Sequence, residues 1–169
     1  MISDVLDVAT RPARPDDLSA IVALQARAFG PGRFARTAYR LREGTPMLSP
    51  YCRVAHAGDR LIAAVRMTPI TIGGEPGALL LGPLAVDPEW AGRGYARQLV
   101  AEVLDTARAA GERLVLLVGD MAYYGRLGFA PVPPGQIRMP GPVDPARLLA
   151  AELEAGACAR FRGMVAARS

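Results

Sequence analysis

The sequence lacks lysine and asparagine altogether and contains a single histidine and two cysteines. Its 20 basic residues are therefore all arginine, and with 16 acidic residues they give a formal net charge of +4. The arginines are scattered along the chain, whereas a surface that follows nucleic-acid phosphates needs them clustered. Together with the high alanine, glycine and proline content, this pattern indicates codon bias from a GC-rich genome, and we predict no nucleic-acid partner.

The scarcity of cysteine and histidine also argues against a metal site. Cys52 and Cys158 lie far apart, form no CxxC motif and have no neighbouring histidine, since the one histidine is His56. A zinc site needs about four such ligands at close spacing. We therefore predict no metal, and we expect both cysteines to be reduced thiols in the core.

Long hydrophobic runs are missing as well. The longest apolar run lies near residues 78–81 and is far too short to span a bilayer. Residues 1–10 include Asp4 and Asp7 and lack the basic start and unbroken apolar stretch of a signal peptide. The sequence predicts a cytoplasmic protein without a membrane partner.

What is present suits one compact α/β domain. The chain has 169 residues, of which 51% are hydrophobic, enough for a substantial core but not for two comfortable domains. We find no internal repeat and no low-complexity linker. The prediction is a single domain over residues 1–169.

The first half predicts strands around one amphipathic helix. A strand is expected over 6–11, and a helix begins at Arg14-Pro15-Asp16-Asp17, since proline and acidic residues favour a first turn. Gly30-Pro31-Gly32 should end this helix, and a second helix is expected over 33–42. Strands are predicted over 51–57 and 60–72 around a Gly58-Asp59 turn, and over 78–86. The last is nearly all apolar, as in a strand covered on both faces.

In the second half of the chain, the spacing of apolar residues changes from a strand pattern to a helical one. Apolar residues at helical spacing predict a helix over 95–110, which Gly111 ends. A strand over 114–118 follows, parallel to 78–86 if the unit is a β-helix-β crossover. A short helix over 122–127 and a β segment beginning at 129–132 lead into an irregular proline-rich segment. We expect a helix over 145–153 and a final strand over 159–166 that pairs back on the sheet.

The most informative segment is the glycine-containing loop between the 78–86 strand and the 95–110 helix. Backbone N–H groups at a helix start are unpaired, and with the helix dipole they form a site for phosphate or pyrophosphate. Gly92 and Gly94 allow close approach of an anion, and Arg93 adds charge. The glycine spacing does not fit a dinucleotide-binding loop, and a Walker loop needs a lysine. A plain glycine turn into a helix remains an alternative.

Two segments resemble motifs of the GNAT superfamily of N-acetyltransferases. Ala91-Gly92-Arg93-Gly94-Tyr95-Ala96 is similar to its pyrophosphate-binding motif [Q/R]-x-x-G-x-[G/A], with Ala91 departing at the first position. The segment Gly119–Phe129 is similar to its closing motif F-Y-x-[K/R]-x-G-F. The resemblance covers roughly residues 11–132. A bacterial subgroup, the YhbS-like predicted acyltransferases, is particularly similar in the amino-acid sequence of residues 119–129 and of the tail near 139–164.

The resemblance implies a fold and a reaction. The fold is α/β (α+β), with a mixed central sheet, splayed parallel strands and flanking helices. The reaction is transfer of an acetyl group from acetyl-CoA to a small-molecule or peptide amine by direct attack in a ternary complex. Tyr124 would be the general acid toward the CoA sulfur, and a backbone N–H near Val86 would polarise the carbonyl. The implied cofactor contacts are the pantetheine-facing backbone of Leu84, Ala85 and Val86 and the pyrophosphate-binding residues Gly92, Arg93, Gly94, Tyr95 and Ala96.

Several points stay open at this stage. The 78–86 strand has no acidic residue to act as general base. Asp120 is either that base or the N-cap of the short helix, and Tyr124 is either catalytic or an aromatic packed beside Tyr123. A non-catalytic acyl-CoA sensor or scaffold is the alternative function, kept open by Ala91 and by the missing acidic residue. A homodimer is compatible with the sequence, which does not identify the acceptor.

Overall fold

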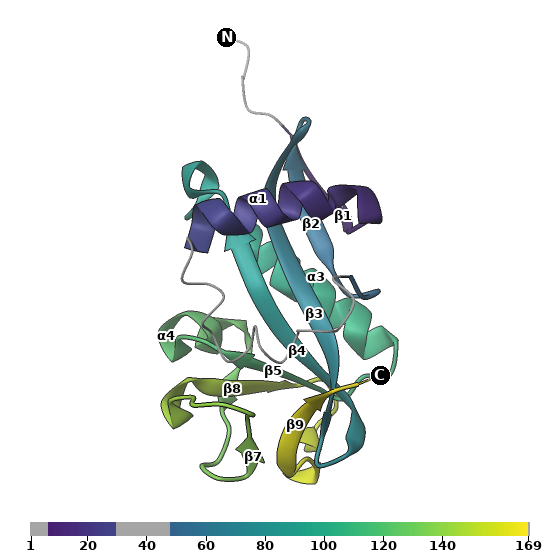
Figure 1. Ribbon diagram of the computed structural model, residues 1–169, viewed down its shortest axis with the longest axis vertical. Coiled ribbons are helices and arrows are strands. Elements are labelled where there is room, and N and C mark those ends of the chain that lie inside the picture. The colour runs from purple at the N-terminus through teal and green to yellow at the C-terminus, as the bar shows by residue number, and fades with distance from the viewer. Residues whose placement is uncertain (1–6, 30–47, 169) are drawn as a thin grey trace.

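One sheet forms the centre of the molecule in the computed structural model, which describes residues 7–29 and 48–168 (Figure 1). Within these residues the strand path is β1-β2-β3-β4-β5-β8-β6, with β9 paired to β3 and β7 paired to β9. The strands are β1 (Val8–Pro12), β2 (Arg53–Ala57), β3 (Arg60–Ile72), β4 (Glu75–Val86), β5 (Leu114–Val118), β6 (Ala130–Pro131), β7 (Ile137–Arg138), β8 (Leu148–Glu152) and β9 (Gly163–Ala167). The helices are α1 (Leu18–Phe29), α3 (Tyr95–Ala109) and the single turn α4 (Met121–Tyr124).

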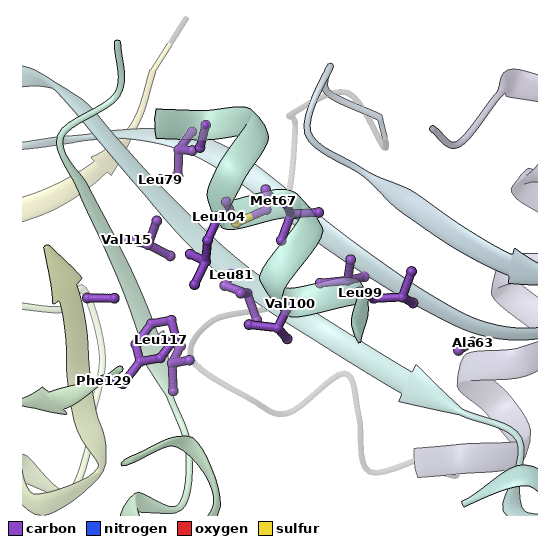
Figure 2. Close-up of a cluster of buried hydrophobic side chains, with 14 of the residues drawn as sticks. Ala63, Met67, Leu79, Leu81, Leu99, Val100, Leu104, Val115, Leu117 and Phe129 are labelled. Atoms are coloured by element: carbon purple, nitrogen blue, oxygen red, sulfur yellow. The ribbon is translucent and has the colours of Figure 1, made fainter. Parts of the chain in front are cut away.

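Helices α1 and α3 cover opposite faces of the sheet (Figure 1). The apolar stripe of α3 buries Leu99, Val100, Val103, Leu104 and Ala107 against β2, β3 and β4. Burial of each large apolar side chain contributes roughly 1.5–3 kcal/mol. Figure 2 shows this core, in which residues of α3 meet side chains from β3, β4 and β5. On the other face, α1 packs Ile21 and Leu24 onto the sheet.

A bulge in β4 changes which residues face each helix. Val65 of β3 pairs with Leu84 and Met67 pairs with Leu81, so two steps along β3 match three along β4. Before the bulge, odd-numbered residues such as Leu81 face the α3 core; after it, Leu84 and Val86 do. A one-residue slip exchanges the two faces of a strand. The bulge at Gly82-Pro83 therefore decides which side chains of β4 point toward each layer.

The parallel pair β4–β5 is joined over only part of its length. The paired residues are Ala78 with Leu114, Leu79 with Val115, and Leu80 with Leu116. Beyond these pairs β4 continues to Val86 and β5 to Val118, and the two strands diverge (Figure 1). Within residues 7–29 and 48–168, the β5-facing edge of β4 after Leu80 therefore has no strand partner. This confirms the expected splay between parallel strands flanked by helices.

Most predicted elements are present. The strands over 60–72 and 114–118 have the predicted bounds, and the helix that begins at Pro15 starts as a 3-10 turn (Pro15–Asp17) before α1. The predicted helix over 122–127 is α4 followed by a 3-10 turn (Gly125–Leu127). The predicted helix over 33–42 and the Gly30-Pro31-Gly32 helix end lie outside the described residues.

The helix predicted over 145–153 is wrong. Pro145–Arg147 form a 3-10 turn, and β8 follows and pairs antiparallel with β5. Leu149 and Ala151 join the α3-side core, while Leu148 and Ala150 join the core on the opposite face. Burial on both faces overrides the helical propensity of a Leu- and Ala-rich segment.

The end of the chain follows the prediction in pairing but not in bounds. The strand expected over 159–166 is β9, and residues 157–160 form a 3-10 turn instead. β9 pairs back on β3, with Val165 opposite Ile72. No helix among the described residues is long and apolar enough to cross a membrane.

Candidate functional site

A cavity of about 320 Å³ lies where β4 and β5 separate. Its described lining comes from α1, from residues 81–84 of β4, from residues 117–119 at the end of β5, from α4 and from the turn before β8. Two of its walls are thus the diverging parallel strands. The arrangement leaves a strand edge that no described strand pairs along an open cavity, where an extended chain can form backbone hydrogen bonds.

Tyr124, the predicted catalytic residue, lines this cavity. Its ring packs edge-on against Phe129, with centroids 5.9 Å apart, and against Tyr123 at 4.9 Å. It also lies against the backbone of Gly119, where an added Cβ would come within 2.5 Å of the Tyr124 ring. Position 119 therefore requires glycine for the ring to sit where it does, a role that sequence reasoning missed.

The short helix that carries Tyr124 begins at Asp120. The Asp120 carboxylate accepts a hydrogen bond from the Ala122 amide at 3.1 Å, as an N-cap does. The capping interpretation of Asp120 is therefore confirmed. Asp120 also lines the cavity and is the one carboxylate among the described lining residues.

Replacement of Asp120 separates its capping role from a role as general base. Asparagine caps as well as aspartate does, so Asp120→Asn should leave both the melting temperature and kcat close to wild type. Asp120→Ala removes the cap and should destabilise the protein by about 1 kcal/mol. Thermal unfolding and steady-state kinetics measure the two effects. A kcat loss of about 100-fold in a stable Asp120→Asn protein would instead identify Asp120 as the base.

The glycine loop lies between β4 and α3, as the sequence predicts. Gly92 and Gly94 have φ of 76° and 88°, and Gly94 is the N-cap of α3. Among the described residues, the amides of Gly92, Arg93 and Gly94 have no backbone acceptor. The first amides of α3 have no intrahelical acceptor either, by the geometry of a helix. The loop thus presents donors at the positive end of a 15-residue helix.

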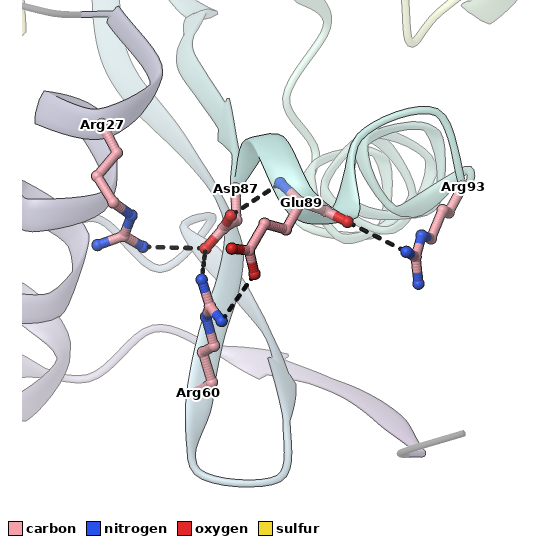
Figure 3. A network of polar contacts seen from close by, with 5 residues as sticks. All are labelled: Arg27, Arg60, Asp87, Glu89 and Arg93. Atoms are coloured by element: carbon pink, nitrogen blue, oxygen red, sulfur yellow. Dashed lines mark hydrogen bonds and ion pairs between the residues drawn. The ribbon is translucent and has the colours of Figure 1, made fainter. Parts of the chain in front are cut away.

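A buried carboxylate anchors the start of this loop (Figure 3). The Asp87 side chain is only 2% exposed and accepts hydrogen bonds from Arg60 at 2.7 Å, from the Glu89 amide at 3.0 Å and from Arg27 at 3.4 Å. Arg60 comes from the start of β3 and Arg27 from α1. Burial alone would raise the pKa of Asp87, but the Glu89 amide and the two guanidinium groups outweigh it and hold the pKa below its usual range.

The far side of the loop is tied down through Arg93. Its guanidinium donates to the Glu89 carbonyl at 3.1 Å and lies 4.8 Å from the centre of the Trp90 ring. The Trp90 ring is in turn 6.1 Å from that of Tyr95. The loop is therefore held at both ends, which reduces the conformational entropy that a bound anion would have to remove.

Loss of the Asp87 charge should weaken both the fold and the loop. Asp87→Asn leaves two guanidinium groups without their carboxylate and should destabilise the protein by about 1–3 kcal/mol at pH 7. Because the folded-state pKa is lowered, the charge contributes fully above the pKa of an unfolded carboxyl, about 3.9, and is lost as pH falls through the folded value. The gap in melting temperature between wild type and Asp87→Asn should therefore narrow below pH 4. An unchanged gap at pH 3 would contradict this account.

The remaining predicted residues occupy two places. Leu84 lines the cavity. Ala85 is buried on the α1 face, and Val86 packs against the α3 core. Gly92, Arg93 and Gly94 are exposed, and Tyr95 and Ala96 are partly exposed at the start of α3. Strand β4 thus contributes to the cavity and leads directly into the loop.

The structure adds residues to the cavity that sequence reasoning did not assign. Gln25 and Phe29 of α1, Gly82 and Pro83 of the β4 bulge, and Arg147 before β8 also line it. The glycine-proline pair in a strand is a sequence signal for a bulge. His56 lies on β2 and is not among the described lining residues. The described residues contain no group of His, Cys, Asp and Glu that would hold a metal.

Comparison with known proteins relates this site to one family. Residues 9–132 match the family model described as the acetyltransferase (GNAT) domain. The Escherichia coli protein named uncharacterized N-acetyltransferase YhbS is 35% identical over 116 residues, which cover 68% of this chain and 69% of that protein.

Two solved structures are similar to this chain in both sequence and fold. The crystal structure of the Escherichia coli GNAT family N-acetyltransferase YhbS in complex with CoA has a TM-score of 0.84 and 30% identity, covering 99% of this chain and 93% of that one. A GNAT family acetyltransferase from Brucella melitensis in complex with acetyl-CoA has a TM-score of 0.65 and 29% identity, covering 85% and 95%. The chain belongs to the GNAT acetyltransferase family and is an acyltransferase of that type.

Proposed function

We propose that this protein transfers the acetyl group of acetyl-CoA to an amine by direct attack in a ternary complex. One observation carries the proposal. A single strand, β4, lines a cavity opposite Tyr124 and runs directly into a glycine loop whose amides have no backbone acceptor among the described residues. A ligand with an anionic group at one end and a reactive group at the other fits that arrangement. Acetyl-CoA has this form, and the similar structures from Escherichia coli and Brucella melitensis contain CoA and acetyl-CoA.

In this proposal the pyrophosphate binds at the start of α3. The donors are the backbone amides of Gly92, Arg93 and Gly94, followed by those of Tyr95 and Ala96 in the first helical turn. Ala91 removes a side chain at the first motif position but leaves these amides intact. The pantetheine arm then runs along the β5-facing edge of β4, past Val86, Ala85 and Leu84, toward the cavity. The Asp87 network holds the segment between the two sites.

The chemistry requires two bond changes and one proton delivered to sulfur. The amine nitrogen attacks the thioester carbonyl carbon, and the carbon–sulfur bond then breaks. Tyr124 donates its proton to the departing CoA thiolate and later regains one from solvent. A backbone N–H of β4 polarises the carbonyl oxygen, and the positioning of both substrates supplies much of the remaining rate enhancement.

Either a water molecule accepts the amine proton, or the acceptor binds with its amine already deprotonated. The β4 segment from Ala78 to Val86 has no acidic side chain, and Asp120 is engaged as a cap. A neutral amine is the nucleophile, so turnover should rise with pH as more of the acceptor is deprotonated.

A thiol-release assay with acetyl-CoA and a panel of amines tests the proposal. Release of CoA together with an N-acetylated product, in proportion to enzyme, is the expected result. Tight CoA binding measured by calorimetry, with no release for any amine, would instead favour the sensor or scaffold alternative. Electrospray analysis of the protein after acetyl-CoA alone should show no acyl-enzyme, because direct attack forms none.

The domain extent, cellular location and acceptor class are further parts of this proposal. We propose one acyltransferase domain over residues 1–169, a cytoplasmic location, and a small-molecule or peptide amine as acceptor. A homodimer is equally compatible, and sedimentation measures it directly.

A further inference from the structure

The cavity contains one cationic side chain among its described lining residues, Arg147. Two other arginines near a functional segment, Arg60 and Arg27, meet the Asp87 carboxylate. The Arg147 side chain, in contrast, is exposed and forms no hydrogen bond or ion pair with the described residues. A guanidinium beside a substrate cavity that forms no ion pair with a described carboxylate is a binding group for an anion.

The position of Arg147 is fixed by its backbone. Its amide donates to the Asp144 carbonyl at 2.9 Å, and its carbonyl accepts from the Gly119 amide at 2.9 Å. The next residue, Leu148, pairs with Val118 at the end of β5. Arg147 is therefore held beside Gly119, the same residue on which the Tyr124 ring packs. The backbone of Arg147 therefore lies at the part of the cavity where Tyr124 and the end of β5 meet.

The charges and volume of the cavity limit what can bind there. Asp120 provides a negative charge and Arg147 a positive one, while most of the remaining described lining is apolar or aromatic. A volume of about 320 Å³ is at the small end for ligand sites and must also hold the acyl end of the donor. A small acceptor that carries both an amine and an anionic group fits this charge distribution.

We propose that Arg147 selects the acceptor by binding its carboxylate, so that the acceptor is an amine of amino-acid size bearing a carboxylate. The planar guanidinium matches a carboxylate with two parallel hydrogen bonds, which fixes orientation as well as adding affinity. Arg147 acts on acceptor binding and not on the acyl transfer itself. The inference rests on the proposed acetyl transfer.

Matched amine pairs test the proposal on the wild-type enzyme. Phenylalanine and 2-phenylethylamine, tyrosine and tyramine, and histidine and histamine differ only in the carboxylate. The carboxylate-bearing member of at least one pair should have a kcat/KM about 10- to 100-fold higher, the range expected for a charge-assisted pair. Transfer that is equal for both members of every pair, or better without the carboxylate, overturns the role of Arg147 but leaves acetyl transfer standing. No transfer to any amine overturns the proposed function and this inference with it.

Variants of Arg147 locate the preference. Arg147→Gln should remove most of the 10- to 100-fold preference by raising KM for the carboxylate-bearing amine. The kinetic constants for the matched amine without a carboxylate should change little. Arg147→Lys keeps the charge but not the fork, and should retain part of the preference. Arg162→Gln, which removes an exposed arginine that is not among the described lining residues, should behave as wild type.

A binding measurement distinguishes acceptor recognition from donor recognition. CoA affinity measured by calorimetry should be the same for Arg147→Gln and wild type. A fall of about tenfold or more would place Arg147 on the CoA phosphates and overturn the proposal. The melting temperature should also be unchanged, since the backbone bonds at 147 do not involve the side chain.

Discussion

Replacing Tyr124 with phenylalanine should lower kcat by about 10²–10⁴-fold while barely changing acetyl-CoA affinity. A well-placed general acid contributes a factor of this size, and only the hydroxyl is removed. Phenylalanine keeps the ring, which packs against Phe129, Tyr123 and the Gly119 backbone. The melting temperature should therefore stay close to wild type. Steady-state kinetics, calorimetry with CoA and thermal unfolding on the same preparations measure the three quantities.

Two further variants sharpen this experiment. Tyr123→Phe removes the hydroxyl of the neighbouring residue, which also lines the cavity, and should change kcat by no more than a few-fold. Gly119→Ala keeps the Tyr124 hydroxyl but places a methyl group within 2.5 Å of its ring, so the ring must move and kcat should fall. Wild-type turnover in Tyr124→Phe would rule out the acid role. A rate loss with a large fall in melting temperature would point to misfolding instead.

Much of the fold could be predicted from the sequence, because in the β4–α3–β5 unit the local hydrophobic pattern and the tertiary environment favour the same structure. The apolar stripe of α3 repeats at helical spacing, and the short apolar run of β5 is buried on both faces. The β4–α3–β5 crossover then sets the parallel pair and places the glycine loop at a helix start. The two motif segments could be located from sequence because each depends on neighbouring residues.

The predictions failed where the local structure depends on residues that are distant in the sequence. Leu148–Glu152 reads as helix by propensity, yet it is a strand because β5 and β6 flank it and both of its faces are buried. The bulge at Gly82-Pro83 exchanges the faces of β4, and a periodic pattern does not reveal such a slip. Arg147 and Gln25 reach the cavity from elements remote in sequence, so no local motif marks them.

The glycine loop gives the other large effect, because Gly94→Val should abolish CoA binding while leaving the fold largely intact. Gly94 has a φ of 88°, a conformation that valine adopts only with strain, so the loop must rearrange and its amides turn away from the phosphate. An added Cβ at Gly94 has open space around it, so the effect is conformational and not a clash with the core. Loss of two charge-assisted hydrogen bonds corresponds to at least about 100-fold in affinity.

Gly111 offers a matched control at the opposite end of the same helix. It also has a φ of 88° with open space around an added Cβ, but it lies beyond the C-terminus of α3, away from the loop. Gly111→Val should therefore have a similar cost in stability and leave CoA affinity unchanged. Ala91→Arg should be neutral or bind CoA slightly more tightly, since the backbone supplies most of the contacts. Calorimetry on the three folded variants decides the assignment: undiminished CoA affinity in Gly94→Val, or equal losses in Gly94→Val and Gly111→Val, would mean that the pyrophosphate binds elsewhere.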